Sequence, residues 1–215
     1  MGVKARDRKW TYRYFAFVLL TLLISSSLAV AAFGGQFEDA MAAIERGDYT
    51  TAFRLMKPLA EQGEAEAQFH LGVMYTIGKG VPRDYTGGVK WFRRSAEQGN
   101  VDAQSNLGVL YSSGKGVPRD YAEAVKWFRR SAEQGFVDAQ FNLGVHYASG
   151  IGIPQDYVSA HMWYNLAASR YSASEGKYQK EAKKSRDRVA SKMTPAQIAE
   201  AQRMAREWKP KKEVK

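Results

Sequence analysis

Three consecutive copies of one 36-residue unit occupy the centre of this 215-residue chain, at residues 62–97, 98–133 and 134–169. The first copy matches the middle copy at 25 of 36 positions and the third matches it at 20, and neither comparison needs a gap. Repetition at a fixed period of this length is typical of a solenoid, in which every unit packs against its neighbours. The repeat therefore constrains the fold more tightly than it constrains the function.

Each copy begins with a pattern that predicts a helix. In the middle copy, Ala103, Leu107 and Leu110 recur at helical spacing, so we expect a helix over about residues 102–112. The glycines that follow, in Gly114-Lys-Gly116, end this helix because glycine adopts left-handed backbone angles at little cost.

A second helix is expected in the same copy, over about residues 121–133. Pro118 disfavours helix at the residue before it, and Asp120 is well suited to cap the helix that follows. The side chains expected to be buried are Tyr121, Ala124, Val125, Trp127, Phe128 and Ala132. Two helices per copy predict an all-α fold, a solenoid of α/α helical hairpins.

Four short motifs recur in register through the copies. They are Ala-Gln at 67–68, 103–104 and 139–140, Leu-Gly-x-x-Tyr at 71–75, 107–111 and 143–147, Gly-x-Gly-x-Pro-x-Asp-Tyr at 78–85, 114–121 and 150–157, and Trp-aromatic at 91–92, 127–128 and 163–164. This pattern resembles the Sel1-like repeat family, whose helical hairpins are related to tetratricopeptide repeats. The resemblance covers about residues 37–169 and implies a superhelix that binds other proteins.

One departure from the pattern is the pair Gly87-Gly88, where the middle copy has Glu123-Ala124. Two glycines inside a helix cost about 1 kcal/mol each relative to alanine. The hairpin over residues 62–97 is therefore expected to be the softest of the three.

The segments on either side of the copies are expected to cap the array. Residues 32–62 match the unit only in their second half and predict an N-terminal capping hairpin. Residues 170–208 predict two C-terminal capping helices, the second starting at Thr194, and residues 209–215 form a basic tail that is expected to fray. The buried positions expected on the two helices are Tyr178, Ala182, Val189 and Met193, then Ile198, Ala201, Ala205 and Trp208.

The first 31 residues have the pattern of a secretory signal peptide. Five Lys and Arg residues precede the apolar run 15–24, and the small residues 29–31 are suited to cleavage. The alternative is an uncleaved membrane anchor over residues 14–33, which is long enough to span a bilayer. Both interpretations predict an exported protein, periplasmic or extracellular.

The net charge of +10 is concentrated at the two ends of the chain. Residues 32–169 contain thirteen Lys and Arg against fifteen Asp and Glu, so the repeats have no basic face suited to nucleic acid. The chain has no cysteine, which excludes disulfides, thiolate metal sites and a cysteine nucleophile.

The sequence contains no arrangement of residues that indicates catalysis. His146 and His161 occupy positions that are apolar in the other copies, and no additional carboxylate departs from the pattern to complete a zinc site. The Ser-x-x-Lys motif at 112–115 and the phosphate-loop-like stretch 72–79 are both explained by the repeat turn. We therefore expect no metal, no cofactor and no enzymatic activity.

The first helices of the copies are expected to line the concave side of the solenoid and to form a peptide groove. Side chains left exposed in an apolar strip commonly mark a partner site. The residues predicted to line the groove are Phe69, His70, Val73, Ser105, Asn106, Val109, Phe141, Asn142 and Val145. The alternative is that curvature buries Phe69 and Phe141 between units.

These observations favour a non-catalytic scaffold or adaptor of the cell envelope that binds another protein or a peptide. Two alternatives remain open. One is a cell-wall-directed hydrolase or penicillin-recognising protein built on the same scaffold. The other is electrostatic attachment to an anionic envelope polymer or lipid through the basic segment 177–215.

Overall fold

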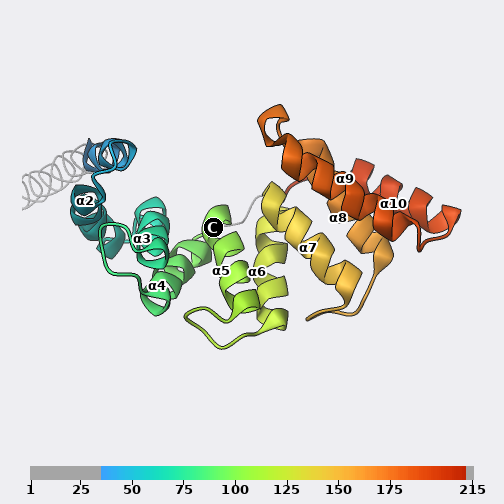
Figure 1. Ribbon diagram of the computed structural model, residues 1–215, viewed down its shortest axis with the longest axis horizontal. Helices are drawn as coiled ribbons and strands as arrows, with labels where there is room; N and C mark the ends of the chain where they lie inside the picture. Colours follow the sequence, from blue (N-terminus) through green and yellow to red (C-terminus); the bar gives the residue numbers. More distant parts are fainter. Residues whose placement is uncertain (1–34, 212–215) are drawn as a thin grey trace, which may run out of the picture.

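The computed structural model describes residues 35–211, in which the helices stack in chain order along an arc (Figure 1). Every regular element in this range is helical, which confirms the predicted all-α solenoid. The predicted signal peptide, residues 1–31, and the alternative anchor, residues 14–33, lie outside the described residues. Between residues 35 and 211, no helix is long and apolar enough to cross a membrane.

The helices form consecutive antiparallel pairs. A helix over residues 35–45 precedes α2 (Tyr49–Glu61), α3 (Ala65–Ile77), α4 (Tyr85–Glu97), α5 (Val101–Ser113), α6 (Tyr121–Glu133), α7 (Val137–Ser149), α8 (Tyr157–Arg170), the 3₁₀ turn η1 (Ala173–Glu175), α9 (Gly176–Ala190) and α10 (Pro195–Glu207). Helices α9 and α10 both pack against α8.

A glycine on the first helix of each hairpin allows an aromatic ring of the second helix to pack closely. A Cβ atom on Gly108 would lie 2.6 Å from the ring of Phe128. The same relation holds between Gly72 and Phe92 and between Gly144 and Tyr164. Any larger residue at these positions would push the paired helices apart, so glycine and aromatic residue recur together.

The Gly87-Gly88 pair has a packing explanation. A Cβ atom on Gly88 would lie 2.5 Å from Cγ2 of Thr76 on the facing helix. In the next two units, the corresponding pairs are Ser112 with Ala124 and Ala148 with Ala160. Thr76 on α3 is thus larger than its equivalents, and Gly88 on α4 has no side chain to clash with it. Helix α4 continues through both glycines.

A buried glutamine ties each hairpin to the preceding one. Nε2 of Gln104, which is fully buried, donates to the carbonyl oxygen of Ala96 at the end of the previous hairpin, at 3.1 Å. The equivalent bonds join Gln68 to Ala60 at 3.0 Å and Gln140 to Ala132 at 3.2 Å.

A second glutamine extends this network within the hairpin. Gln98 donates to Oε1 of Gln68 at 2.8 Å, and Gln134 donates to Oε1 of Gln104 at 2.9 Å. In the last unit, Arg170 takes this position and lies 4.2 Å from the centre of the Trp208 ring. Within residues 35–211, Oε1 of Gln140 consequently has no hydrogen-bond partner.

The C-terminal helices follow the prediction in part. Thr194 and Gln197 form the expected capping box at the start of α10, and the alanines expected to be buried on α9 and α10 are buried. The prediction for Tyr178 is wrong, because its side chain is 59% exposed. It lies in the first turn of α9 and stacks on Tyr171 instead of entering the core.

Two further expectations need correction. The start of the tail does not fray, since the backbone N–H of Lys211 donates to the carbonyl oxygen of Glu133 at 2.8 Å and its Nζ donates to the Glu133 carboxylate at 3.0 Å. Tyr121, which was expected to be buried, is 36% exposed because it occupies the first position of α6, beside the loop.

The loop inside each hairpin touches the backbone of the preceding hairpin through a glycine. Gly116 has a φ of 73°, and a Cβ atom there would lie 2.4 Å from the carbonyl carbon of Tyr85. Gly80 and Gly152 repeat both features against Tyr49 and Tyr121. These glycines therefore satisfy two constraints, a left-handed backbone and a close contact between units.

Replacement of Gly116 by alanine should test this contact. We expect Gly116→Ala to lower the free energy of unfolding by about 2–4 kcal/mol, the sum of left-handed backbone strain and a backbone clash. Gly47→Ala is the matched control, because Gly47 has a φ of 77° but no atom within 4 Å of its Cβ position. The control should lose only about 1–2 kcal/mol in urea denaturation. Equal losses in the two variants would show that the inter-unit contact contributes nothing.

Candidate peptide-binding groove

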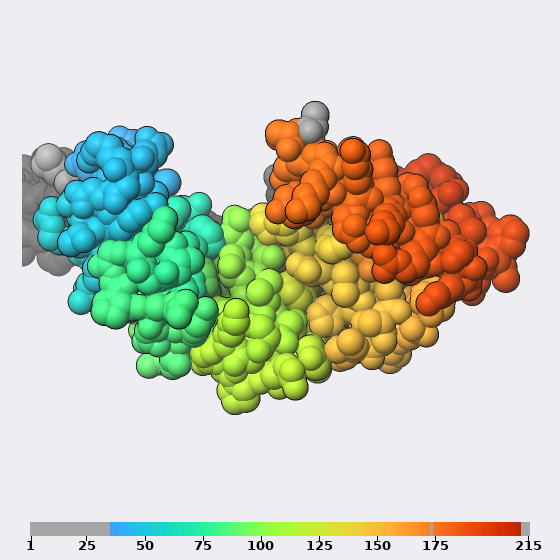
Figure 2. All heavy atoms as spheres, in the orientation of Figure 1, coloured from blue at the N-terminus to red at the C-terminus, as the bar shows by residue number. Residues whose placement is uncertain are grey.

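A hollow of about 510 Å³ lies between α5, the N-terminal part of α7 and the segment 171–178. Figure 2 shows the surface notched where this segment, in orange, rises beside α5 and α7. Five of the nine predicted groove residues line the hollow, namely Ser105, Asn106, Val109, Phe141 and Asn142. The fold thus brings these five together, and their role in binding stays a prediction.

The apolar residues of the hollow differ in exposure. Val109 is 48% exposed, whereas Ser105 is 5% exposed and lies nearly buried. Phe141 is half-buried, and its ring centre lies 5.5 Å from that of Tyr164 on α8. In this hollow, Val109 is therefore exposed, whereas Ser105 and Phe141 lie deeper and Phe141 packs against the core.

The three predicted residues on α3 do not line this hollow. Phe69 and Val73 are half-buried against the core between α4 and α5, and the Phe69 ring lies 5.9 Å from that of Phe92. His70 packs between the rings of Phe69 and Phe37. Burial lowers the pKa of His70, an effect that the nearby carboxylate of Glu66 opposes. Phe69 is thus partly buried between units, in the direction of the alternative that curvature buries it.

Carboxylates surround the hollow, a feature that the sequence did not predict. Asp102, Asp138 and Glu175 are among the residues that line it, and none of its lining residues is Lys or Arg. Burial raises the pKa of Asp102, and the negative charge of Glu66 raises it further. The hollow is therefore a site of crowded negative charge on a chain whose net charge is positive.

Two tyrosines complete the rim of the hollow. The rings of Tyr171 and Tyr178 are stacked, with centres 5.9 Å apart. The hydroxyl of Tyr171 donates to Oδ1 of Asp138 at 2.8 Å, and burial together with this bond raises the pKa of Tyr171. The repeat pattern ends before residue 170, so no periodic equivalent indicated that these tyrosines face the groove.

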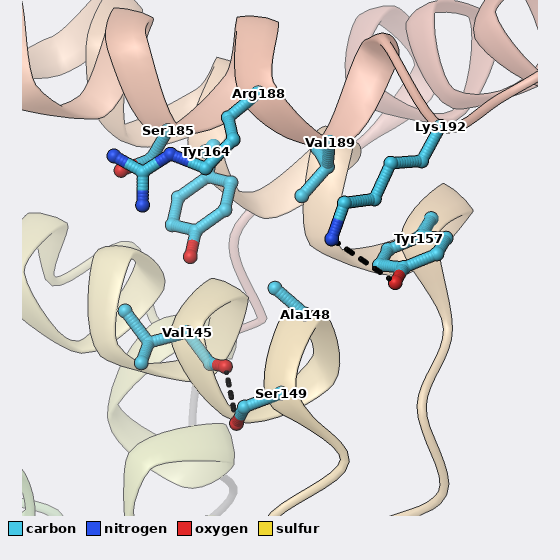
Figure 3. A pocket seen from close by; sticks show the side chains of 9 residues that line it. All are labelled: Val145, Ala148, Ser149, Tyr157, Tyr164, Ser185, Arg188, Val189 and Lys192. Carbon is cyan, nitrogen blue, oxygen red and sulfur yellow. Dashed lines mark hydrogen bonds between the residues drawn. The ribbon is translucent and has the colours of Figure 1, made fainter.

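A second hollow, of about 250 Å³, lies farther along α7, near its C-terminal end. Its floor includes Val145, the sixth predicted groove residue, which is 40% exposed. Figure 3 shows the side chains that converge on it from α7, from α8 and from α9 with the residues after it. They are Val145, Ala148 and Ser149 of α7, Tyr157 and Tyr164 of α8, and Ser185, Arg188, Val189 and Lys192 from α9 and the residues after it.

The polar groups of the second hollow are cations and hydroxyls. Its lining includes Arg188 and Lys192 and no Asp or Glu. Nζ of Lys192 donates to the hydroxyl oxygen of Tyr157 at 3.4 Å. Tyr164 is 4% exposed, and its hydroxyl points toward the space between Val145 and Ala148 (Figure 3). Burial raises the pKa of Tyr164 to about 12, so this hydroxyl keeps its proton at neutral pH.

His146 and His161, which lie on one hairpin, have different neighbours. Nδ1 of His146 lies 2.7 Å from the carbonyl oxygen of Ile151, and its ring packs against Phe128 of the preceding hairpin. His161 is 3% exposed, and its Nδ1 has no hydrogen-bond partner among the residues the structure describes. In residues 35–211, no three His, Cys, Asp or Glu side chains lie close enough together to hold a metal ion.

The Sel1 repeat model matches residues 34–64, 65–100, 101–136 and 137–172. It counts the shortened first hairpin as a repeat, whereas the sequence predicted a cap there, and it divides the full units three residues later. A search of curated proteins finds no match.

Two Sel1-type proteins are among the solved structures that are similar to this chain. A Sel1 repeat protein from Oxalobacter formigenes is 30% identical, with a TM-score of 0.62 over 68% of this chain and 56% of that one. A protective antigen of uropathogenic Escherichia coli that displays an SLR fold is 26% identical, with a TM-score of 0.56 over 87% of this chain and 47% of that one. The chain thus spans about half the length of each structure.

The buried imidazole of His161 should make stability depend on pH. Burial, with a smaller contribution from Arg186, lowers the pKa of His161 below its ordinary value of 6.5. The unfolded chain therefore binds more protons below about pH 6.5, and the free energy of unfolding falls as the pH falls. We expect His161→Leu to lose less stability between pH 7.5 and pH 5 than the unaltered protein, as measured by urea denaturation. An unchanged loss would mean that His161 does not contribute.

Proposed function

Because the chain belongs to the Sel1 repeat family, we propose that it is a non-catalytic scaffold that binds an extended segment of a partner protein in the groove along α7. Sel1 repeats form helical scaffolds that typically mediate protein–protein interaction. The observation that carries the proposal is the presence of two hollows along α7, each with one exposed valine, Val109 or Val145.

The chemistry of the groove suits a peptide. Exposed valines beside half-buried aromatic rings provide apolar contacts for alternate side chains of an extended segment. The amides of Asn106 and Asn142 lie in the same hollow, and an amide can both donate to and accept from a peptide backbone. Such a strip holds a partner by many weak contacts and requires no catalytic group.

Blocking the groove at its exposed valines should abolish partner binding without unfolding the protein. We expect Val109→Arg combined with Val145→Arg to lose at least about tenfold in affinity, because the long side chains fill both hollows. The measurement is the affinity of seven-residue peptides that are selected from a random displayed library on the unaltered protein.

The matched control is Ala122→Arg, which adds the same side chain at an exposed position of α6 that lines neither hollow. It should bind the selected peptides as the unaltered protein does. Circular dichroism and urea denaturation establish that the variants remain folded. Selected peptides that bind the groove variant undiminished would show that the partner uses another surface.

We further propose that the protein acts in the cell envelope, exported by residues 1–31. Support comes from the charged, apolar and small-residue segments in that order. The chain recovered from cells should begin near residue 32, and Leu19→Arg with Leu22→Arg should keep it inside the cell with its first residues intact. Cell fractionation and N-terminal sequencing provide the measurement. Membrane-bound protein that retains residues 1–31 would favour the anchor, and an intact chain in the cytoplasm would contradict export.

A further inference from the structure

The two hollows on α7 carry opposite charges, and from this we infer the chemistry of the partner segment. We propose that the groove selects an extended segment of a partner protein with a Lys or Arg side chain at one end and a carboxylate at the other. The basic group would enter the hollow at the N-terminal end of α7, and the carboxylate the hollow at its C-terminal end. This inference rests on the proposed function, since it concerns the same groove.

The first hollow is built to attract a cation. Three carboxylates line it without a compensating Lys or Arg among the lining residues. Asp138 accepts a hydrogen bond from the Tyr171 hydroxyl and Glu175 accepts one from the backbone N–H of Ser172, and both of these donors are neutral groups. Burial raises the pKa of Asp102, and the negative charges of Glu66 and Asp138 raise it further, so a bound cation would relieve this repulsion.

Aromatic rings at the same hollow suit the long stem of a basic side chain. The stacked pair Tyr171 and Tyr178 stands at the rim, and Tyr178 is 59% exposed. A Lys or Arg side chain can lay its methylene groups along a ring face while its charged end reaches a carboxylate. The hollow of about 510 Å³ leaves room for such a side chain.

The second hollow is built to attract an anion. Arg188 and Lys192 line it without an acidic residue among the lining side chains. The hydroxyl of Tyr164 points into it from a side chain that is 4% exposed (Figure 3). A carboxylate would accept a bond from this hydroxyl and from Arg188, and such charge-assisted bonds are among the strongest in proteins.

The helix dipole of α7 acts in the opposite direction, because its N-terminus is partly positive and its C-terminus partly negative. Each terminus carries about half an elementary charge. Three Asp and Glu side chains line one hollow, an Arg and a Lys side chain line the other, and their formal charges exceed the partial charges of the helix termini. The side chains therefore set the polarity of the groove.

The geometry of α7 sets the spacing between the two charges of the partner. Asp138 at one hollow and Ser149 at the other are 11 residues apart on one helix. At 1.5 Å per residue this is about 16 Å. An extended chain advances about 3.3–3.6 Å per residue, so the two charges should lie four to five positions apart. The residues between them would contact Phe141 and Val145.

An array of capped nine-residue peptides tests the inference. Each peptide contains one Lys and one Asp at separations of one to seven positions, and matched peptides contain only the Lys or only the Asp. Binding should be strongest at separations of four and five and should fall at least about threefold when either charge is removed.

Variants that remove one charge test each end of the groove separately. Asp102→Asn should weaken the binding of peptides that contain Lys and leave the binding of peptides with Asp alone unchanged. Arg188→Gln should weaken the binding of peptides that contain Asp and leave the binding of peptides with Lys alone unchanged. The matched controls are Glu97→Gln and Arg206→Gln, which make the same charge changes at exposed positions that line neither hollow. The controls should leave the binding of every peptide unchanged.

The outcomes separate this inference from the proposed function. If peptides bind and the Val109→Arg, Val145→Arg protein loses them, but charge and spacing have no effect, the groove is real and the inferred charge selection is wrong. If the peptides bind equally to that groove variant, the proposed function fails as well. If no peptide of the array binds while library-selected peptides still occupy the groove, the inference is overturned alone.

Discussion

A buried glutamine amide at each junction holds the array together. Its donor reaches the last turn of the preceding hairpin, and its oxygen is bonded within its own hairpin where the repeat continues. Losing such an amide would leave a buried carbonyl without a partner, which costs about 1–3 kcal/mol. The bond fixes how each hairpin is rotated on its neighbour, and the loop glycine at Gly116 fixes how closely they approach. Together they specify an arc, one unit at a time.

These junctions are made by a buried glutamine of each hairpin and by a glycine of each loop. The concave face of α5 and α7 takes no part in these junction contacts, so its residues can differ between units. The position shared by Phe69, Ser105 and Phe141 is an example, since the same place in the hairpin holds a half-buried ring in two units and a nearly buried hydroxyl in the third. The groove thus combines positions that the copies share, such as Val109 and Val145, with positions that differ between them, such as Ser105 and Phe141.

The fold was predictable from the repeat, because the same pattern of helix-ending glycines, proline and capping aspartate occurs in all three copies. The pattern of Gly114, Pro118 and Asp120 placed the ends of α5 and α6 to within one residue. The prediction failed where the period ends. Tyr178 was assigned to a buried stripe by spacing alone, but the turn at η1 rotates the first residues of α9 toward Tyr171. Lys211 was assigned to a frayed tail, because a hydrogen bond to Glu133, 78 residues away, leaves no local signal.

The residues of the candidate site were also predictable only where the repeat continues. Spacing on α5 and α7 placed five predicted residues around one hollow and a sixth in the next. The charged and aromatic residues opposite them come from 171–192, where no periodicity shows which side chains face the groove. Their contribution follows from α9 packing against α8 in the place that a further repeat would take. The groove is therefore formed by both parts of the chain, since Asp102 and Asp138 lie on the repeats and Glu175, Arg188 and Lys192 lie in the C-terminal segment.

Site-specific photo-crosslinking in intact cells tests the central claim, that the concave face binds a partner segment. A photoreactive amino acid would replace Val109 in one strain and the exposed Ala122 of α6 in another. The account predicts a discrete adduct at position 109, whose crosslinked peptide carries the opposite charges inferred above, and no such adduct at position 122. Adducts formed equally at both positions, or only at position 122, would contradict it.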